Sequence, residues 1–378
     1  MVKIYFFAFL LFATSFALAY EVDQFTNRDK VPADDTTVIL NMTIKQRLEE
    51  SVQKSNTQLF GLFNVNCNSK KKEEQKEARR ILFENLRSAF VSKTDVGLIE
   101  KEIMWDKNVD KRRVSVEQSI YNEAQNKNII LKGILSTYKL APVISVNQVQ
   151  IGTDKLGHFF NEGYALYLQN FSQSDENKRT YNTALFNEST ENDYNGLKTT
   201  GIKSYADLAA NYEGYQFWNK LCGKVYESSS QSDKDYFEKH KCTKDAYIKC
   251  EIDPETKKGR WQLNPYQSFK IEDYVTEAWD ESINCNSYTD AIKTEVLSAL
   301  SRRVYTYKGD PKKPCPAEPN KCLDIYKRYG RSGLYHVISP QCKEIAMANK
   351  KTNPPEKKEE GLPQAKPSSS NKKSKTTR

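Results

Sequence analysis

The 378-residue chain is predicted to be mainly α-helical, an irregular helical domain with a disulfide-rich C-terminal half. Apolar residues recur at helical spacing over several long segments, most clearly over residues 70–90. Strand-like alternation is confined to one short run, residues 143–151. Seven of the eight cysteines follow residue 220, and an even cysteine count in an oxidising compartment favours disulfides.

The first two helices are expected over residues 36–53 and 70–90. In the first, Asp34 or Asp35 can cap the start of the helix. Its apolar stripe consists of Val38, Ile39, Met42, Leu48 and Val52. The second has the stripe Ala78, Ile81, Leu82, Leu86, Ala89 and Phe90. The charged residues 70–74 are interpreted as its solvated first turn.

The secondary-structure patterns in the middle of the chain differ in strength. Residues 115–124 and 128–140 are weaker helical candidates, and 143–151 is a candidate strand. Two helices are then expected over 153–169 and 204–221, joined by a long polar link. Residues 272–303 contain two further helical patterns.

The first 19 residues have the features of a secretory signal peptide. Lys3 precedes a short apolar run, and the small residues Ala17 and Ala19 stand before the expected cleavage site. An uncleaved N-terminal anchor is the alternative, but the apolar run is short for a membrane span. We therefore expect a secreted or periplasmic protein without a transmembrane span. It would comprise a helical domain (20–221), a Cys-rich helical and loop region packed on it (222–349), and a disordered basic tail (350–378).

The net charge of +9 is concentrated in that tail. Residues 350–378 contain nine Lys or Arg and three Glu, a net of +6, and Lys3 adds one more, so the body carries about +2. A nearly neutral body argues against a nucleic-acid surface. We expect the tail to contact a cell-wall polymer or an anionic lipid surface, or else only to keep the chain in solution.

The richest polar pattern lies in the segment expected as a helix over 153–169. Asp154, His158 and Glu162 stand at i, i+4 and i+8, which places them near one helix face. That face is either solvated or lines a cleft. In a cleft, His158 could act as a general base or bind a divalent metal, the one cofactor that the pattern suggests. The His-Glu-x-x-His pattern of common zinc proteases does not occur.

A second polar pattern starts the helix expected over 204–221. Ser204 followed by Asp207 has the spacing of a capping box, so Asp207 either caps this helix or belongs to a site. Asn211 and Gly214 follow one and two turns later. Glycine costs helix stability, and close approach of another backbone is a common reason to keep it. We expect this helix to cross the previous one near Gly214.

Together the two patterns resemble a pair of motifs in VanZ-like and YfiM-like bacterial envelope proteins. The matching residues are Asp154-Lys155-x-x-His158 and Asp207-x-x-Ala210-Asn211-x-x-Gly214, within residues 151–218. VanZ-like proteins are embedded in the membrane, and YfiM-like proteins are usually lipid-anchored. This chain has neither a later apolar span nor a cysteine just after the expected cleavage site. The resemblance implies a place in the bacterial cell envelope and adds Lys155 to the binding residues, but it implies no defined activity.

Two functions fit these patterns. In the first, the chain is a binding or scaffold protein, and Lys155, Asp207, Asn211 and Gly214 belong to a polar site that locks two helices. In the second, it is a hydrolase of peptidoglycan or another envelope polymer or lipid. The catalytic residues would then be His158 as base or metal ligand, Asp154 as its orienting partner, and Glu162 as acid or base. A lysozyme-like reaction would use Glu162 with one of the aspartates.

Overall fold

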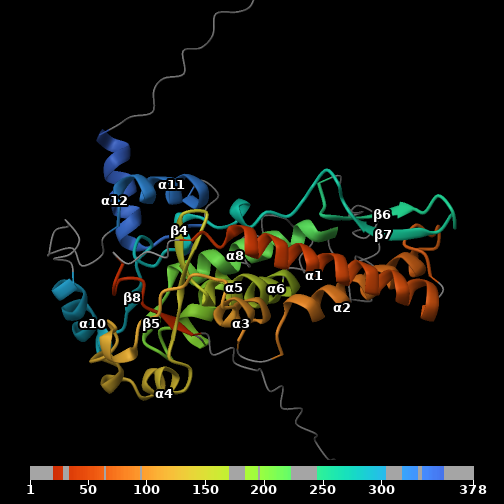
Figure 1. Cartoon of the computed structure of the whole chain (residues 1–378). Coiled ribbons are helices and arrows are strands. Elements are labelled where there is room, and N and C mark those ends of the chain that lie inside the picture. The colour runs from red at the N-terminus through yellow and green to blue at the C-terminus, as the bar shows by residue number, and fades with distance from the viewer. Residues whose placement is uncertain are drawn as a thin grey trace, which may run out of the picture.

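The computed structural model describes residues 20–28, 34–63, 65–93, 96–169, 184–194, 196–222, 245–303, 317–330 and 334–352. Within these ranges the fold is mainly α-helical, as predicted, and strands occur only as two-stranded pairs (Figure 1). The expected signal peptide and residues 353–378 of the expected tail lie outside the described residues. Residues 350–352, which were assigned to the tail, continue the last helix.

The α-helices are α1 (Thr37–Gln58), α2 (Lys72–Phe90), α3 (Leu98–Trp105), α4 (Ile129–Tyr138), α5 (Asp154–Gly157), α6 (Gly163–Gln169), α8 (Tyr205–Cys222), α10 (Asp290–Arg303), α11 (Pro319–Tyr329) and α12 (Pro340–Thr352). Turns of π-helix cover Leu59–Phe63, His158–Glu162 and Thr190–Tyr194. Turns of 3-10 helix cover Val116–Gln118, Ala124–Lys127, Ile271–Asp273, Glu277–Trp279 and Tyr335–Val337.

The strands form four pairs. β1 (Glu21–Val22) pairs in parallel with β2 (Leu140–Ala141). The other pairs are antiparallel: β3 (Val143–Val146) with β4 (Val149–Gly152), β5 (Ile202–Lys203) with β8 (Ser287–Tyr288), and β6 (Ile248–Ile252) with β7 (Gly259–Leu263). The candidate strand over 143–151 is thus two strands of one hairpin. Asn147 and Gln148 form its two-residue turn, and both have the positive φ that such a tight hairpin turn requires.

The weak helix predicted over 115–124 is wrong, because only short 3-10 turns form there. Here side-chain oxygens accept backbone N–H groups that carbonyl groups would accept in a helix. The carboxylate of Asp23 accepts the N–H of Ile120 at 2.9 Å, and the hydroxyl of Ser119 accepts the N–H of Tyr121 at 3.1 Å. In residues 272–303, likewise, only the second predicted pattern forms an α-helix, α10.

Most of the apolar core forms one cluster that spans the described chain. Helices α1, α2, α8 and α11 all contribute to it, so the N-terminal helices and the Cys-rich region share one core. Figure 1 shows α1 and α2 side by side, with the β6–β7 hairpin against the far end of α1. A smaller cluster lies between α4 and α10. Aromatic rings concentrate where α8 crosses the segment 154–169, around Phe159, Phe160 and Phe217.

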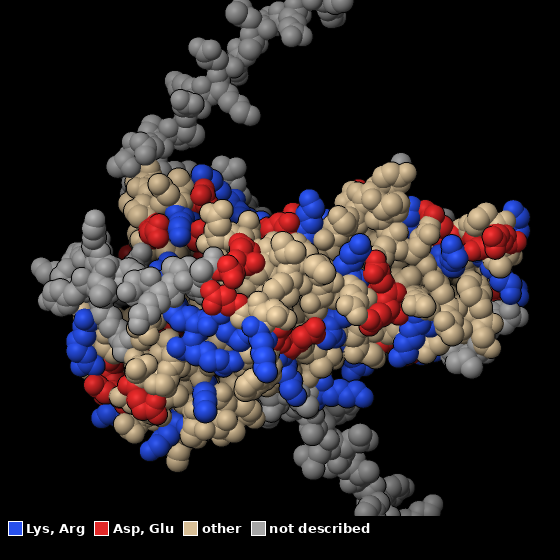
Figure 2. Space-filling model, viewed as in Figure 1, with Lys and Arg blue, Asp and Glu red and all other residues tan. Residues whose placement is uncertain are grey.

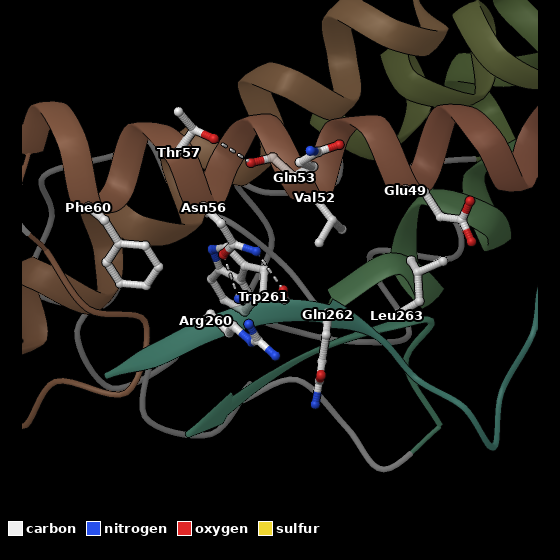
Figure 3. A pocket seen from close by; sticks show the side chains of 10 residues that line it. All are labelled: Glu49, Val52, Gln53, Asn56, Thr57, Phe60, Arg260, Trp261, Gln262 and Leu263. Carbon is white, nitrogen blue, oxygen red and sulfur yellow. Dashed lines mark hydrogen bonds between the residues drawn. The ribbon is translucent and has the colours of Figure 1, made fainter. Parts of the chain in front are cut away.

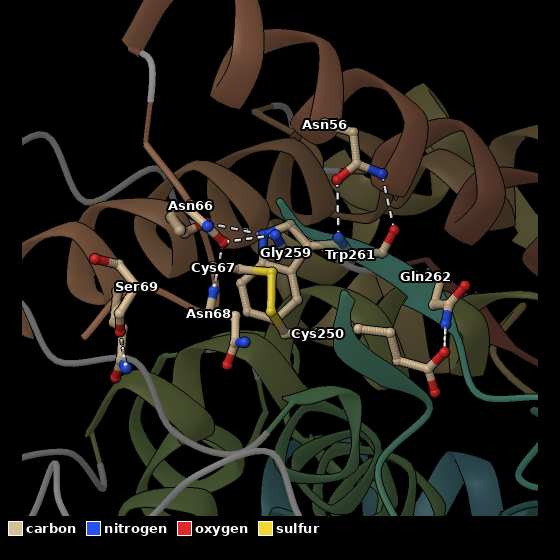
Figure 4. Close-up of a disulfide and its surroundings, with 12 residues drawn as sticks. Asn56, Asn66, Cys67, Asn68, Ser69, Cys250, Gly259, Trp261 and Gln262 are labelled. Carbon is tan, nitrogen blue, oxygen red and sulfur yellow. Dashed lines mark hydrogen bonds between the residues drawn. A yellow bond between two sulfur atoms is a disulfide. The ribbon is translucent and has the colours of Figure 1, made fainter. Parts of the chain in front are cut away.

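Disulfides connect segments that are distant in sequence. Cys67, before α2, is bonded to Cys250 in β6, 183 residues later (Figure 4). Cys322 and Cys342 join α11 to α12. Cys222 and Cys285 each belong to a further disulfide. The C-terminal half therefore has a disulfide of its own and is bonded to the N-terminal helices as well.

Two asparagine side chains satisfy the outer edge of β7. Asn66 Oδ1 accepts the N–H of Gly259 at 2.7 Å. Asn56, on α1, accepts the N–H of Trp261 and donates to its carbonyl, both at 2.8 Å (Figure 4). Asn56 thereby imitates one residue of a neighbouring strand and fixes the hairpin to the helix.

An open groove of about 530 Å³ lies between α1 and β7. Val52, Phe60 and Trp261 give it apolar walls (Figure 3). Figure 3 shows the side chains of Arg260 and Gln262 pointing away from α1, as strand alternation requires. The groove is formed by other elements than the polar motifs.

We predict that Asn56→Ala lowers the free energy of unfolding by about 1–3 kcal/mol, because two backbone groups of Trp261 lose their partner. Gln53→Ala is the matched control. Gln53 lies one turn earlier on the same groove and is exposed, so its loss should change stability by less than about 0.5 kcal/mol. Urea unfolding measures both. Equal midpoints for the two variants would contradict the role given to Asn56.

Candidate functional site

The two segments with the polar motifs cross at a pair of glycines. A Cβ on Gly163 would lie 2.6 Å from the Cα of Gly214, and a Cβ on Gly214 would lie 1.9 Å from the carbonyl oxygen of Phe159. Backbones therefore touch at the crossing, and neither position has room for a side chain. This contact places the polar residues that precede it on the two segments opposite one another.

The segment 154–169 is not the regular helix that its spacing predicts. It consists of α5, a π-helical turn over His158–Glu162, and α6. Asp154 and His158 lie before and at the start of this turn and are buried, whereas Glu162 at its end is half-buried. The π-turn changes the spacing, so Glu162 does not share the buried environment of Asp154 and His158 as the regular helix predicted. Single π-turns within helices are frequent at functional sites.

The centre of the site is the side chain of Lys155, which is completely buried. Its Nζ lies 2.6 Å from Asp154 Oδ2, 2.5 Å from Asp207 Oδ1 and 2.7 Å from Glu281 Oε1. These carboxylates come from α5, α8 and the loop that follows the turn Glu277–Trp279. One ammonium group thus joins three segments of the chain.

His158 lies beside this ion cluster and begins a chain of side-chain amides. Its Nδ1 is 3.0 Å from Asn211 Oδ1, and its Nε2 is 3.3 Å from Asp207 Oδ2. Asn211 Nδ2 donates to Asn187 Oδ1 at 3.0 Å, and Asn187 Nδ2 donates to the carbonyl of Leu208 at 2.9 Å. Because a backbone carbonyl can only accept, it orients both amides in turn.

The start of α8 is tied to the same cluster. Ser204 Oγ accepts the N–H of Asp207 at 3.1 Å, as in the predicted cap, and donates to Glu281 Oε1 at 2.9 Å. Asn286 Nδ2 donates to Glu281 Oε2 at 2.8 Å. Only half of the predicted capping box forms, because the N–H of Ser204 donates to Glu191 Oε2 at 3.3 Å, and the carboxylate of Asp207 lies in the ion cluster instead.

Burial shifts the acidities in this cluster. It raises the pKa of Asp154, and it raises the pKa of Glu281 to about 7. Burial also acts to raise the pKa of Asp207, but His158 and Lys155 outweigh it and lower that pKa. The pKa of Lys155 is raised well above its ordinary value, because the three carboxylates outweigh the burial of the ammonium.

Further buried acids surround the cluster. Burial raises the pKa of Glu21, Glu100 and Glu191 well above its ordinary value, and the nearby carboxylates of Glu281, Asp154 and Asp207 add to the respective shifts. Glu162, at the end of the π-turn, also has a pKa raised by burial. The region is therefore rich in carboxyl groups whose charged form is disfavoured by burial.

The structure brings six of the seven sequence-predicted residues together. Asp154, Lys155, His158, Asp207 and Asn211 are in direct contact, and Gly214 supports them at the crossing. Glu162 remains outside the cluster. Sequence reasoning missed Glu281 and Asn187. The only signal for Glu281 is its place in the polar run after Trp279. Asn187 is marked only as the start of a glycosylation sequon, Asn187-Glu-Ser189, which indicates a different role.

Asp154, His158 and Asp207 together could hold a metal ion. One ligand atom from each can be chosen so that all three lie within 4.8 Å of one another. An imidazole nitrogen with two carboxylate oxygens suits a divalent ion of intermediate softness. The cluster could equally act as an acid and base pair or as a purely structural network.

Among the helices that the structure describes, none is long and apolar enough to cross a membrane. No protein-family profile, curated protein or solved structure matches the chain.

We predict that Gly214→Ala destabilises the protein by at least about 3 kcal/mol, because the added methyl group meets backbone atoms that cannot move away. The matched control is Gly133→Ala. Gly133 lies on the exposed face of α4 with no atom within 4 Å of an added Cβ. Alanine there should therefore raise the free energy of unfolding of the protein by about 0.5–1 kcal/mol. Thermal unfolding of both variants tests the crossing. Similar melting temperatures would refute it.

Lys155→Met should lower the free energy of unfolding by about 3–5 kcal/mol, because three buried carboxylates lose their shared cation. Lys127→Met is the comparison, since Lys127 is exposed and its ion pair with Glu295 spans 3.7 Å. We expect a change below about 0.5 kcal/mol there. Denaturant unfolding with circular dichroism gives both values. If Lys155→Met proved as stable as the wild type, the cluster would not hold the three segments together.

Proposed function

We propose that this chain is an exported protein of the bacterial cell envelope with a binding or scaffold role. The single observation that carries the proposal is the burial of the motif residues against one another. Lys155 is 0% exposed, Asp154 and Asn211 are 1% exposed, and His158 is 3% exposed. Side chains so enclosed contact one another rather than a polymer, which fits a network that fixes two helices.

The proposed compartment has separate support. The signal-like residues 1–19 and the resemblance of residues 151–218 to envelope proteins both favour export. The disulfides fit an oxidising compartment such as the periplasm or the cell exterior. The absence of a membrane-spanning helix among the described residues is consistent with a protein on the outer side of a membrane.

The proposed partner is an anionic surface, either a wall polymer or lipid headgroups. Figure 2 shows Lys and Arg side chains gathered on the viewed face over the region of β4, α3 and α4. The basic tail adds a net charge of +6. Such charge attracts anionic polymers through contacts that salt screens.

A hydrolase is the second candidate, and one observation favours it. Glu162 is half-buried beside His158, and burial raises its pKa, as a general acid requires. Asp207, with its side chain 12% exposed, is the member of the cluster most open to solvent. Glu162 could donate a proton there while His158 or Asp207 acts as base, in a metal-assisted or lysozyme-like reaction.

The test compares His158→Ala with Glu162→Gln in the exported full chain. For a scaffold, we expect His158→Ala to lower the melting temperature by several degrees and Glu162→Gln to leave it unchanged. We also expect no release of dye from labelled peptidoglycan by the wild type. Release that Glu162→Gln abolishes at an unchanged melting temperature would reject the scaffold role and establish the hydrolase.

A further inference from the structure

The chain of amides next to His158 determines which ring nitrogen carries a proton. The carbonyl of Leu208 orients Asn187, and Asn187 orients Asn211 so that its Oδ1 faces the imidazole. Nδ1 must therefore be the N–H donor. In the neutral ring, Nε2 then presents a lone pair to the carboxylates. Ligating histidines are typically held in this way, with the second nitrogen donating to a fixed oxygen.

The Nε2 lone pair faces Asp207 Oδ2, which is also a hydrogen-bond acceptor. Nε2 lies 3.3 Å from Asp207 Oδ2, but within the described residues it has no hydrogen bond of acceptable geometry. Asp154 Oδ1 is also buried without a hydrogen-bond partner there. This oxygen lies only 2.1 Å from the position that a Cβ would take at residue 152, so only glycine leaves room for it there. Acceptors that face one another in a dry site need a proton or a metal ion between them, and only a metal ion could join Asp154, His158 and Asp207 at once.

Lys155 does not supply that cation, because its ammonium contacts the other oxygen of each aspartate. It lies 2.6 Å from Asp154 Oδ2 and 2.5 Å from Asp207 Oδ1. Asp207 Oδ2 is instead the oxygen 3.3 Å from His158 Nε2, and Asp154 Oδ1 has no hydrogen-bond partner among the described residues.

We infer that Asp154, His158 and Asp207 bind one divalent ion of the Zn²⁺ type. In a tetrahedral site, Zn–N and Zn–O bonds of about 2.0–2.2 Å place two ligand atoms roughly 3.4 Å apart. The three candidate ligand atoms lie within 4.8 Å of one another, so the side chains would have to close in by about 1 Å around the ion. Ca²⁺ is excluded as the preferred ion because it takes six to eight oxygen ligands and no imidazole. The inference is independent of the proposed function, since such an ion can hold a scaffold or serve a hydrolase.

The test uses the full exported chain after treatment with a chelator. Titration with Zn²⁺ in a calorimeter should show one site per chain, and Ca²⁺ at the same concentration should give no comparable heat. His158→Gln and Asp154→Asn should each weaken Zn²⁺ binding by about 100-fold or more. Asn211→Leu keeps all three ligands but frees the ring, so we expect a loss of about 10- to 100-fold. Lys127→Met, at the exposed position already used as a comparison, should bind Zn²⁺ like the wild type.

Cobalt provides a readout that needs no variant. Co²⁺ bound by the wild type should show intense visible absorption, typical of a low-coordinate site, which added Zn²⁺ removes. The inference is overturned if Zn²⁺ does not bind at one per chain, or if His158→Gln, shown to be folded by circular dichroism, binds it as the wild type does. It is likewise overturned if bound Co²⁺ keeps the weak spectrum of the hydrated ion. Zn²⁺ binding without release of dye from peptidoglycan would leave the scaffold role in place.

Discussion

The structure depends on the burial of one ammonium group. Lys155 has no access to water, and moving a charge from water into a protein interior costs several kcal/mol unless opposite charges and hydrogen bonds compensate. Three carboxylates provide that compensation, from α5, α8 and the loop that contains Glu281. The cation therefore dictates the arrangement of these segments. Contacts of this kind specify one geometry more sharply than apolar packing, which tolerates small shifts.

The glycines at the crossing make this arrangement attainable. Because Gly163 and Gly214 bring backbones into contact, short side chains such as aspartate and asparagine can reach between the two segments. A wider separation of the helices would require longer side chains with more conformational freedom to lose on folding. The aromatic rings of Phe159, Phe160 and Phe217 pack next to the crossing and keep it dry. Apolar packing and the polar cluster thus support each other.

Much of the fold could be predicted from the sequence, because local patterns determine it. The apolar stripe of α2 and the cap of α8 by Ser204 act within one or two turns of helix. The failures arose where distant residues take over the backbone. Asp23, 97 positions before Ile120, accepts a hydrogen bond that a helix would have made internally. The π-turn at His158 likewise leaves no mark in the spacing of polar residues.

The two motifs of the candidate site could be predicted from the sequence, but the third segment, which contributes Glu281, could not. Glu281 follows Lys155 by 126 positions, and no periodicity connects them.

The outer edge of β7 has a consequence of another kind. Its N–H groups at Gly259 and Trp261 are taken by Asn66 and Asn56, so two of the donors on which another chain could add a strand are already occupied. This makes the edge of β7 a poorer template for aggregation, although the hairpin projects at one end of the molecule (Figure 1).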